Sequence, residues 1–535
     1  MYAISITAPH GAHYERSDSM KRTLIMVLTA VLMLSIMQPV LAEVTYPIQT
    51  DDNTLTFWAP IQPIASKYMT SFKDHIIYSI ISENTGMVIE WQNCSPSDGA
   101  NQLSLIVAGG DLPDILQIRG MYPGGASAGV SEGIFVDLTD YLPEYAPDYW
   151  KALTSSDLCY RLCTDENGRI AAFYYLTVTA PSYRRFNVLQ ETMDEYGFEI
   201  PTTIADYEAI FARLQEDGLT GLYLNTNGRE PILMWPYGIA NGWMLDENGK
   251  VAFGMYTQAY KDYLTMMHDW YEKGYIYKDF MSTITTLEMY SLLTSKTVFM
   301  EAESVDLINS ACNTSGLNSV PLPYVRLEEG QAIHFDSTYN ELVPSDGFAT
   351  TVISTDCKNL KEAIMYMNYY YTEEGSDLCN WGIKDVYYTV DENGQKHFTD
   401  LMLKNPDMPL GDVQMNFKLH MTAKLSEADV ICNPNVVADE VALAKRTKYS
   451  DDPTFDNAQV LPAFPFNAEA SEARSDIMND INTYVDEMTL KFITGVTSLD
   501  MFDSYMEQLK AMGIEDAIAI TQSQYDAFMN KPGLQ

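Results

Sequence analysis

The chain has 535 residues, of which 46% are hydrophobic and 12% aromatic, so it is too long for one hydrophobic core and too apolar to be disordered. With 33 Lys and Arg residues against 73 Asp and Glu residues, its formal net charge is -40, and this charge repels phosphate backbones and anionic lipid headgroups. We therefore expect at least two packed lobes and no nucleic-acid partner.

The N-terminal segment has the pattern of a signal peptide. Met20-Lys-Arg22 supplies a positive start, and residues 24–37 form an apolar run that is short for a bilayer span. Val40-Leu-Ala42 then offers the small residues that signal peptidase requires. We predict cleavage after Ala42 and a chain that is secreted or held at the cell surface. An uncleaved anchor helix is the alternative, and a start codon at Met20 in place of Met1 stays open.

The cysteines are few for a secreted chain of this size. There are seven of them, an odd number, so no disulfide framework is predicted. Cys159 and Cys163 lie one helical turn apart and could pair, but burial as two small apolar side chains is the preferred interpretation.

Beyond residue 53 the hydrophobic pattern alternates between strands and helices. Residues 54–58 predict a buried strand, 67–84 a helix that ends at Gly86, and 88–91 a second strand. The remaining predicted strands are 114–118, 297–300 and 348–353, and the remaining predicted helices are 102–108, 202–215 with a Thr-Thr cap, 259–272 and 361–372, followed by three helices between 471 and 528. This alternation is typical of a mostly parallel sheet with helices on both faces.

The tetrapeptide Asp-Glu-Asn-Gly occurs three times, starting at Asp165, Asp246 and Asp391. In each case it separates apolar or aromatic segments, and Asn-Gly is the residue pair that favours positive φ angles in two-residue hairpin turns. A calcium loop would need its Gly five positions after the first Asp, but here the Gly comes three positions after it. We therefore predict three hairpin turns.

A hydrolase motif is present but poorly placed. Gly125-Ala-Ser-Ala-Gly129 matches the nucleophile elbow, which requires its Ser directly after a strand and before a helix. The predicted strand ends at Ile118, and six residues intervene before the motif. A flexible Gly-rich loop is the preferred interpretation, and no catalytic residue is predicted.

No metal or cofactor is predicted. Five histidines follow the predicted cleavage site, and no two have metal-ligand spacing: His75, His268, His334, His397 and His420. A calcium site remains open at Asp451, Asp452 and Asp456, which could equally be solvated. A pair of glycosidase carboxylates is defined by its separation, and sequence does not supply that separation.

Aromatic residues gather beside the Pro, Gly and polar residues that end the predicted strands. They are Trp58, Tyr122, Tyr174 with Tyr175, Trp235 with Tyr237, Trp243 and Trp381. Ligands of open α/β sheets bind beyond the carboxyl ends of the strands, and a sugar offers C–H groups to a flat ring and hydroxyls to polar side chains. Burial of each Trp in a core is the alternative.

The order of motifs resembles the extracellular solute-binding protein family 1 of carbohydrate ABC importers, and within it the large LipO-like type of Gram-positive bacteria. The matching stretches are Glu83-Asn-Thr-Gly86, Ala108-Gly-Gly-Asp-Leu-Pro-Asp-Ile115, Tyr196-Gly-Phe-Glu-Ile-Pro-Thr-Thr203, Trp270-Tyr-Glu-Lys-Gly274, Tyr369-Tyr-Tyr-Thr-Glu-Glu-Gly375 with Asn380-Trp-Gly-Ile383, and Ala511-Met-Gly-Ile-Glu515 with Gln522-Ser-Gln-Tyr-Asp526. Two departures are the lack of a lipid-attachment Cys in residues 1–50 and Lys384 in place of the usual acidic residue.

The resemblance implies the two-lobed α/β fold of type II periplasmic-binding proteins, with two mostly parallel sheets, flanking helices and a hinge. It implies three crossings between the lobes, near Leu176, Pro344 and Val390. The implied domains are 1–42 as signal peptide, 43–176 as the first part of lobe one, 177–344 as the first part of lobe two, 345–390 as the return to lobe one, and 391–535 as the second part of lobe two with a helical C-terminus.

The resemblance also implies a ligand between the lobes. The residues expected to bind it are Trp58, Arg119, Tyr122, Tyr174, Trp235, Trp243, Glu301 and Trp381. Trp and Tyr would stack on sugar rings, while Arg119 and Glu301 would hydrogen-bond rim hydroxyls.

The implied function is that of a monomeric, non-catalytic receptor that binds an oligosaccharide and delivers it to the permease subunits of an ABC importer. A ligand that contacts both lobes stabilises the closed state, which the transporter recognises. Two alternatives stay open: a secreted glycan-acting enzyme that uses two acidic residues, and a binding protein for a peptide or another non-sugar solute.

Overall fold

The computed structural model describes most of the chain after the predicted signal peptide. The described residues are 43–61, 65–178, 184–224, 227–282, 286–335, 342–345, 350–408, 410–417, 419, 422–426, 444–445, 448–449, 452–531 and 533. The predicted signal peptide, His420, Cys432 and Asp451 lie outside them. Among these residues, no helix combines the length and the apolar character that crossing a membrane requires.

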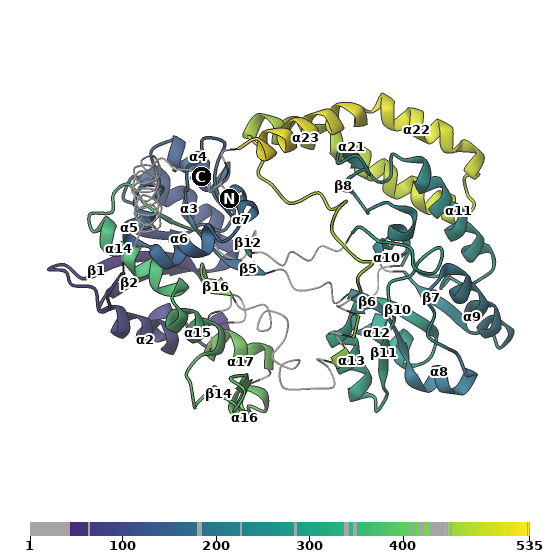
Figure 1. Ribbon diagram of the computed structural model, residues 1–535, viewed down its shortest axis with the longest axis horizontal. Coiled ribbons are helices and arrows are strands. Elements are labelled where there is room, and N and C mark those ends of the chain that lie inside the picture. Colours follow the sequence, from purple (N-terminus) through teal and green to yellow (C-terminus); the bar gives the residue numbers. More distant parts are fainter. Residues whose placement is uncertain are drawn as a thin grey trace, which may run out of the picture.

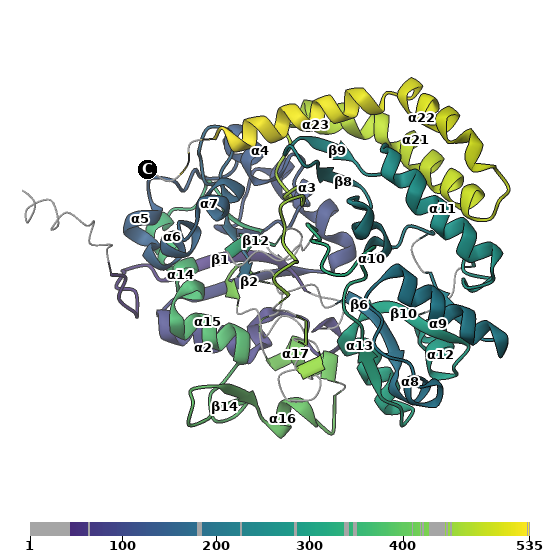
Figure 2. The ribbon, with the colours of Figure 1, turned by 45° about the vertical axis from the view of Figure 1, so that its right-hand side comes forward.

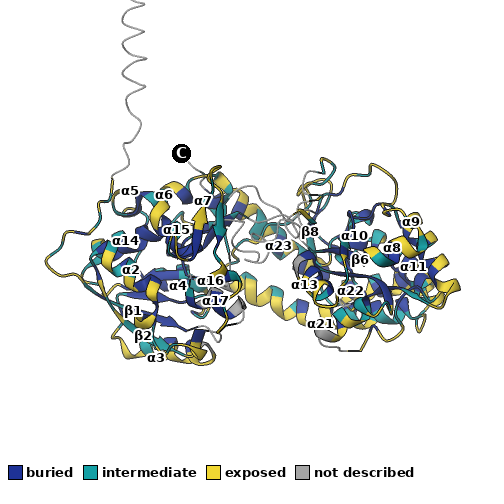
Figure 3. Cartoon of the chain, turned by 90° about the horizontal axis from the view of Figure 1, so that it is seen from below, coloured by how far each residue is buried: buried dark blue, intermediate teal, exposed yellow. Residues whose placement is uncertain are grey.

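The chain forms two α/β lobes, each around a hydrophobic core of its own (Figures 1 and 2). The first-lobe core takes residues from 48–176 and 353–423, and the second-lobe core takes residues from 186–335 and 478–517. Figure 3 shows the buried residues inside each lobe and the exposed residues on the outer helices. The expected two-lobed α/β fold is therefore present.

The first lobe contains a five-stranded sheet in the order β2-β1-β3-β13-β4. Its strands are β1 (Thr54–Pro60), β2 (Val88–Cys94), β3 (Ile115–Gln117), β4 (Phe173–Tyr174) and β13 (Thr350–Ile353). The helices of this lobe are α2 (Ile76–Thr85), α3 (Gly99–Gly109), α4 (Gly125–Ser131), α5 (Leu142–Tyr145), α6 (Pro147–Leu153), α7 (Asp157–Cys163), α14 (Leu360–Asn368), α15 (Glu373–Trp381), α16 (Asp400–Leu403) and α17 (Leu410–Phe417).

The second lobe contains a four-stranded sheet in the order β11-β6-β10-β7. Its strands are β6 (Arg184–Leu189), β7 (Thr220–Tyr223), β10 (Val298–Ser304) and β11 (Ser319–Pro321), with a separate hairpin of β8 (Trp243–Leu245) and β9 (Val251–Phe253). The helices are α8 (Gln190–Tyr196), α9 (Ile204–Glu216), α10 (Pro231–Met234), α11 (Gln258–Glu272), α12 (Thr286–Thr294), α13 (Val305–Thr314), α21 (Ala468–Ile493), α22 (Phe502–Ala511) and α23 (Ile514–Met529).

Both main sheets are mixed, although the sequence predicted mostly parallel pairing. In the first lobe β1 runs parallel to β2 and β3, but β13 is antiparallel to both of its neighbours. In the second lobe only β10 and β7 are parallel, since β6 is antiparallel to β10 and to β11. The antiparallel strands β6 and β13 each follow a crossing between the lobes. There the chain enters the sheet in the direction opposite to that of the neighbouring strands.

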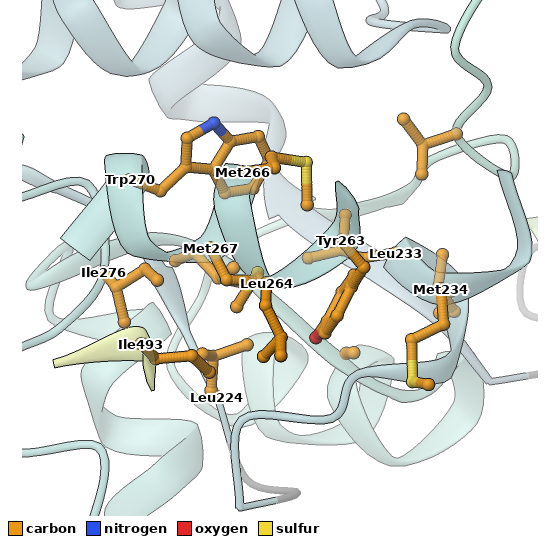
Figure 4. Packing of buried hydrophobic residues seen from close by; sticks show 14 of the residues in the cluster. Leu224, Leu233, Met234, Tyr263, Leu264, Met266, Met267, Trp270, Ile276 and Ile493 are labelled. Atoms are coloured by element: carbon orange, nitrogen blue, oxygen red, sulfur yellow. The ribbon is translucent and has the colours of Figure 1, made fainter. Parts of the chain in front are cut away.

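Local signals explain several element ends. The Thr203 side chain accepts a hydrogen bond from the backbone N–H of Asp206, and the Asp206 side chain bonds the Thr203 N–H in return, so the predicted cap opens α9. Gly86, at a φ of 74°, ends α2 in the left-handed conformation. In the second-lobe core, Leu264 and Met267 of α11 lie against Leu224, as Figure 4 shows. Local sequence signals thus determine where the helices begin and end, and burial of their apolar side chains determines which face packs against the core.

Two of the three Asp-Glu-Asn-Gly segments connect hairpin strands. The segment at Asp246 joins β8 and β9, and the segment at Asp391 joins β14 (Tyr388–Val390) and β15 (Lys396–Phe398). The segment at Asp165 forms the same turn without flanking strands. Only the Gly of each segment has a positive φ, so the loops are three-residue turns ending in a left-handed Gly and not the expected two-residue turns.

The lobes are joined through a third, three-stranded sheet, which we call the hinge sheet. It contains β5 (Leu176–Val178), β12 (Leu342–Pro344) and β16 (Leu425–Ser426), with β5 in the middle. Strand β5 pairs antiparallel with β12 and parallel with β16. Each of its strands therefore lies where the chain passes between the two lobes.

The domain limit expected near Val390 does not fit this packing. The segment after Val390 stays with the first lobe, because Phe398, Met402, Val413 and Leu419 are buried in the first-lobe core. The third crossing follows β16 instead. In the sequence, the hairpin turn at Asp391 looks like a crossing between the lobes. The two are distinguished in the structure by the core in which the apolar residues after the turn are buried.

Asn380 anchors the hinge sheet to the first lobe. Its side-chain N–H donates to the carbonyl of Leu425 at 2.9 Å, and its carbonyl oxygen accepts a 2.6 Å hydrogen bond from the buried ammonium of Lys424. Lys424 also donates to the carbonyl of Leu419 at 2.7 Å. Because Asn380 belongs to α15, this helix holds β16 in place beside the crossing.

We expect Asn380→Leu to lower the free energy of unfolding by about 2–3 kcal/mol, because the buried Lys424 ammonium loses an acceptor. Chemical denaturation of the purified chain measures this change. Asn479→Leu is the matched control, since Asn479 is an exposed residue of α21. Equal stability of the two variants would contradict the anchoring role.

Candidate functional site

The candidate site consists of the polar and aromatic side chains beside the hinge sheet. In the first lobe these are Arg119, which follows β3, and Tyr174, which ends β4; strand β13 lies between β3 and β4. The backbone N–H of Arg119 donates to the carbonyl of Thr350 at 3.3 Å, and Thr350 pairs with Tyr174 across β13 and β4. The chain then runs from Tyr174 into β5, which begins at Leu176. Two of the predicted residues thus flank the first residue of β13, and Tyr174 lies directly before the hinge strand β5.

Arg119 has an unusual backbone conformation. Its φ is 46°, in the left-handed region that residues with a Cβ rarely adopt. Burial lowers the pKa of its guanidinium below the ordinary value, while the nearby Tyr78 opposes that effect. Such backbone strain is concentrated at functional sites in proteins. The conformation sets the direction of the only strongly basic side chain among the eight predicted residues.

The structure places Trp58, Tyr122 and Trp381 inside the first lobe. Trp58 and Trp381 are 3% exposed, and Tyr122 is 7% exposed. The indole of Trp381 packs on Phe398 at a centroid distance of 4.7 Å, and the Tyr122 hydroxyl donates to the Glu132 carboxylate. Because protein atoms cover these three rings, we do not include them in the proposed site.

In the second lobe an ion pair lies at the start of β6, directly after the first crossing. The Arg184 guanidinium donates to both carboxylate oxygens of Glu230, at 2.5 and 2.8 Å. Glu230 is 1% exposed, whereas Arg184 remains partly exposed. The fork geometry fixes both groups and leaves a polar edge toward the hinge. Sequence reasoning missed this pair, because 46 positions separate its members.

An aromatic group lies close to this polar edge. Tyr324 stacks on Phe455 at 4.3 Å, and the half-buried Trp235 meets Tyr324 edge to face at 5.1 Å. The guanidinium of Arg185 lies 4.0 Å over the Tyr324 ring. Trp235 therefore packs on a rigid support, which reduces the side-chain entropy that the protein would lose when a ligand stacks against this ring.

Trp243 lies in a different place. It belongs to the β8–β9 hairpin, where its ring packs on Phe253 at 5.3 Å and receives the guanidinium of Arg474, from α21, at 5.5 Å. The structure does not gather Trp243 with Trp235, although only a few residues separate them in the chain.

Glu301 is completely buried in β10. Among the described residues, neither of its carboxylate oxygens has a hydrogen-bond partner, and the side-chain oxygen of Asn187, opposite it on β6, has none either. Burial, assisted by Glu303, raises the pKa of Glu301 from 4.5 to about 8, against the opposing effect of Arg184. Burial therefore favours the protonated form of Glu301, and the side chain does not reach the surface to bind a ligand in this conformation.

Other residues that could have suggested chemistry have structural roles. Ser127 lies inside α4 and not on a sharp turn after a strand. The Asp452 carboxylate accepts from Arg326 at 2.5 Å, and Asp456 contacts His334 at 2.8 Å. Across the described part of the chain, no group of three or more His, Cys, Asp or Glu residues could hold a metal ion.

We expect Glu301→Gln to remove the pH dependence that this side chain gives to stability. Since folding raises its pKa from 4.5 to about 8, the free energy of unfolding should fall as pH rises through this interval, by up to about 1.4 kcal/mol per pH unit. Urea denaturation at a series of pH values tests this. Glu507→Gln, an exposed substitution, is the control, and a wild-type slope that persists in Glu301→Gln would refute the assignment.

Comparison with known proteins gives three concordant likenesses. FusA of Streptococcus pneumoniae, named as a fructooligosaccharide ABC transporter substrate-binding protein, is 22% identical, with 91% of this chain and 93% of FusA covered. YtcQ of Bacillus subtilis, named as a polygalacturonan/rhamnogalacturonan-binding protein, is 21% identical, with 80% and 83% covered. A solved solute-binding protein from Bifidobacterium longum infantis, described as HMO binding and ABC-transporter associated, has a TM-score of 0.69 at 17% identity, with 90% of this chain and 99% of that chain covered.

The structural likeness shows the fold, and it agrees with the two α/β lobes described above. The family model of bacterial extracellular solute-binding proteins matches residues 69–378, which is more than half of the 535-residue chain. The resemblance seen in the sequence is confirmed. The chain belongs to the bacterial extracellular solute-binding proteins.

Proposed function

We propose that this chain is the carbohydrate receptor of an ABC importer, which holds an oligosaccharide between its lobes and delivers it to permease subunits. The observation that carries the proposal is that each lobe has polar and aromatic groups where the first crossing begins or ends: Tyr174 directly precedes hinge strand β5, and Arg184 begins β6, the next described strand. The relatives named for oligosaccharides and polysaccharides support the ligand class. The receptor acts outside the cytoplasm, as a monomer and without catalysis.

Both lobes contribute side chains to the proposed site. Arg119 and Tyr174 supply a guanidinium and a phenol from the first lobe, and Arg184 and Trp235 supply a guanidinium and an indole from the second, with the buried Glu230 holding Arg184 in position. Guanidinium groups hydrogen-bond sugar hydroxyls, and flat rings cover the C–H faces of the sugar. A ligand that touches both sets favours the closed arrangement by the difference in its affinity for the two states.

A thermal-shift screen tests the ligand class. We expect a fructooligosaccharide, an oligogalacturonide or a milk oligosaccharide to raise the melting temperature, since a ligand at 100 times its dissociation constant adds about 2.7 kcal/mol to stability. A peptide library is the comparison arm. Stabilisation by peptides alone would contradict the carbohydrate reading, and the appearance of shortened glycans after incubation would indicate an enzyme.

We expect Trp235→Ala to weaken binding of a carbohydrate found in this screen by about tenfold or more, because its half-buried indole is held in place by the supporting aromatic group and remains partly accessible to a ligand. Isothermal titration calorimetry measures the change. Trp150→Ala in α6 is the control, since Trp150 is a half-buried residue whose neighbour Tyr160 also lies in the first lobe. Equal affinities of the two variants would remove Trp235 from the site.

A further inference from the structure

The carboxyl ends of α7 in the first lobe and α23 in the second lobe meet, and each receives a cation from the other. A guanidinium nitrogen of Arg161 donates to the carbonyls of Met529 and Lys531, the latter at 2.8 Å. In return, the Lys531 ammonium donates to the carbonyl of Thr164 at 2.7 Å and to that of Arg161 at 3.3 Å. We call this reciprocal contact the clasp.

The chemistry of helix ends makes the clasp favourable. The last carbonyls of a helix have no partner within the helix and carry partial negative charge, so cations bind there. Lys531 is 9% exposed, and burial lowers its pKa, an effect that Asp165 and Glu166 oppose. Arg161 is held from its own helix by Asp157 at 2.5 Å. The first lobe thus positions both cations. Arg161 belongs to this lobe, and Lys531 is held by the carbonyls of Arg161 and Thr164.

The other end of α23 is fixed in the second lobe. Ile514 and Ala517 are buried in the second-lobe core, and the Gln522 side chain accepts a 2.8 Å hydrogen bond from the backbone N–H of Val251 in β9. Figures 1 and 2 both show α23 extending from the second lobe to the first. Helix α7 in turn packs against the hinge strand β12. The helix therefore bridges the lobes beside the hinge.

We infer that α23 and its clasp form a releasable strap between the lobes, which restricts their rotation to the axis of the hinge sheet. The three covalent crossings permit bending, but short strands alone resist twisting weakly. A helix held at both ends adds a rigid fourth connection whose second attachment consists of hydrogen bonds and charge. This inference rests on the two-lobed fold and not on the identity of the ligand, so it is tested without one.

The experiment compares Lys531→Met and Arg161→Met with the wild type in the mature chain. Hydrogen exchange should become at least tenfold faster in residues 523–531, while protection of both lobe cores stays unchanged. Small-angle scattering should show a broader range of lobe arrangements. Lys510→Met, which removes an exposed ion pair with Glu515 within the second lobe, should leave both readings as in the wild type.

Further variants separate a strap from a simple structural contact. Arg161→Lys keeps a cation and should restore part of the protection. If Arg161→Met fails to fold, ending the chain after Asn530 removes the Lys531 contacts of the clasp without altering the first lobe. Unchanged exchange in residues 523–531, or unchanged scattering despite faster exchange there, would overturn the inference. Loss of carbohydrate binding with an intact clasp would bear on the proposed function alone.

Discussion

The two lobes depend on one constraint: the segments that cross between them share a single small sheet. Strand β5 hydrogen-bonds to both β12 and β16, so the crossings form one unit and not separate tethers. Asn380 and Lys424 join this unit to the first lobe through buried polar contacts, and the Tyr175 hydroxyl adds a 2.8 Å hydrogen bond to Ser426. Because the connection is short and internally bonded, each lobe can move as a body while its core stays packed.

Two buried glutamates in the second lobe show how its charge is arranged. Glu230 receives the fork of Arg184, whereas Glu301 has no hydrogen-bond partner among the described residues and has a raised pKa. Burial of an unpaired charge is costly, and protonation avoids that cost. Arg184 thus satisfies the buried Glu230 carboxylate while remaining partly exposed itself, and burial favours the protonated form of the unpaired Glu301.

Sequence reasoning succeeded where the determinants are local. The left-handed Gly86 and the capping box of Thr203 act within a few residues, so their effects could be read directly, and turns were correctly expected at the Asp-Glu-Asn-Gly segments although their type was not. The family resemblance supplied the two lobes. Individual roles depended on distant partners: the burial of Trp381 needs Phe398, and the pairing of Arg184 needs Glu230. The third crossing was misplaced because the apolar residues of segment 391–426 gave no indication of which core they would join.

The position of β13 has a consequence for the order in which the molecule can assemble. This strand lies between β3 and β4, yet the chain reaches it only after the long excursion through β6, β7, β10 and β11. The N-terminal third of the polypeptide therefore has a gap in its sheet until residues 350–353 are available. The second-lobe core is likewise incomplete until α21 and α23 have been synthesised, because residues of both helices belong to it. Neither half can complete its packing early during synthesis, and such late closure of distant pairings slows folding.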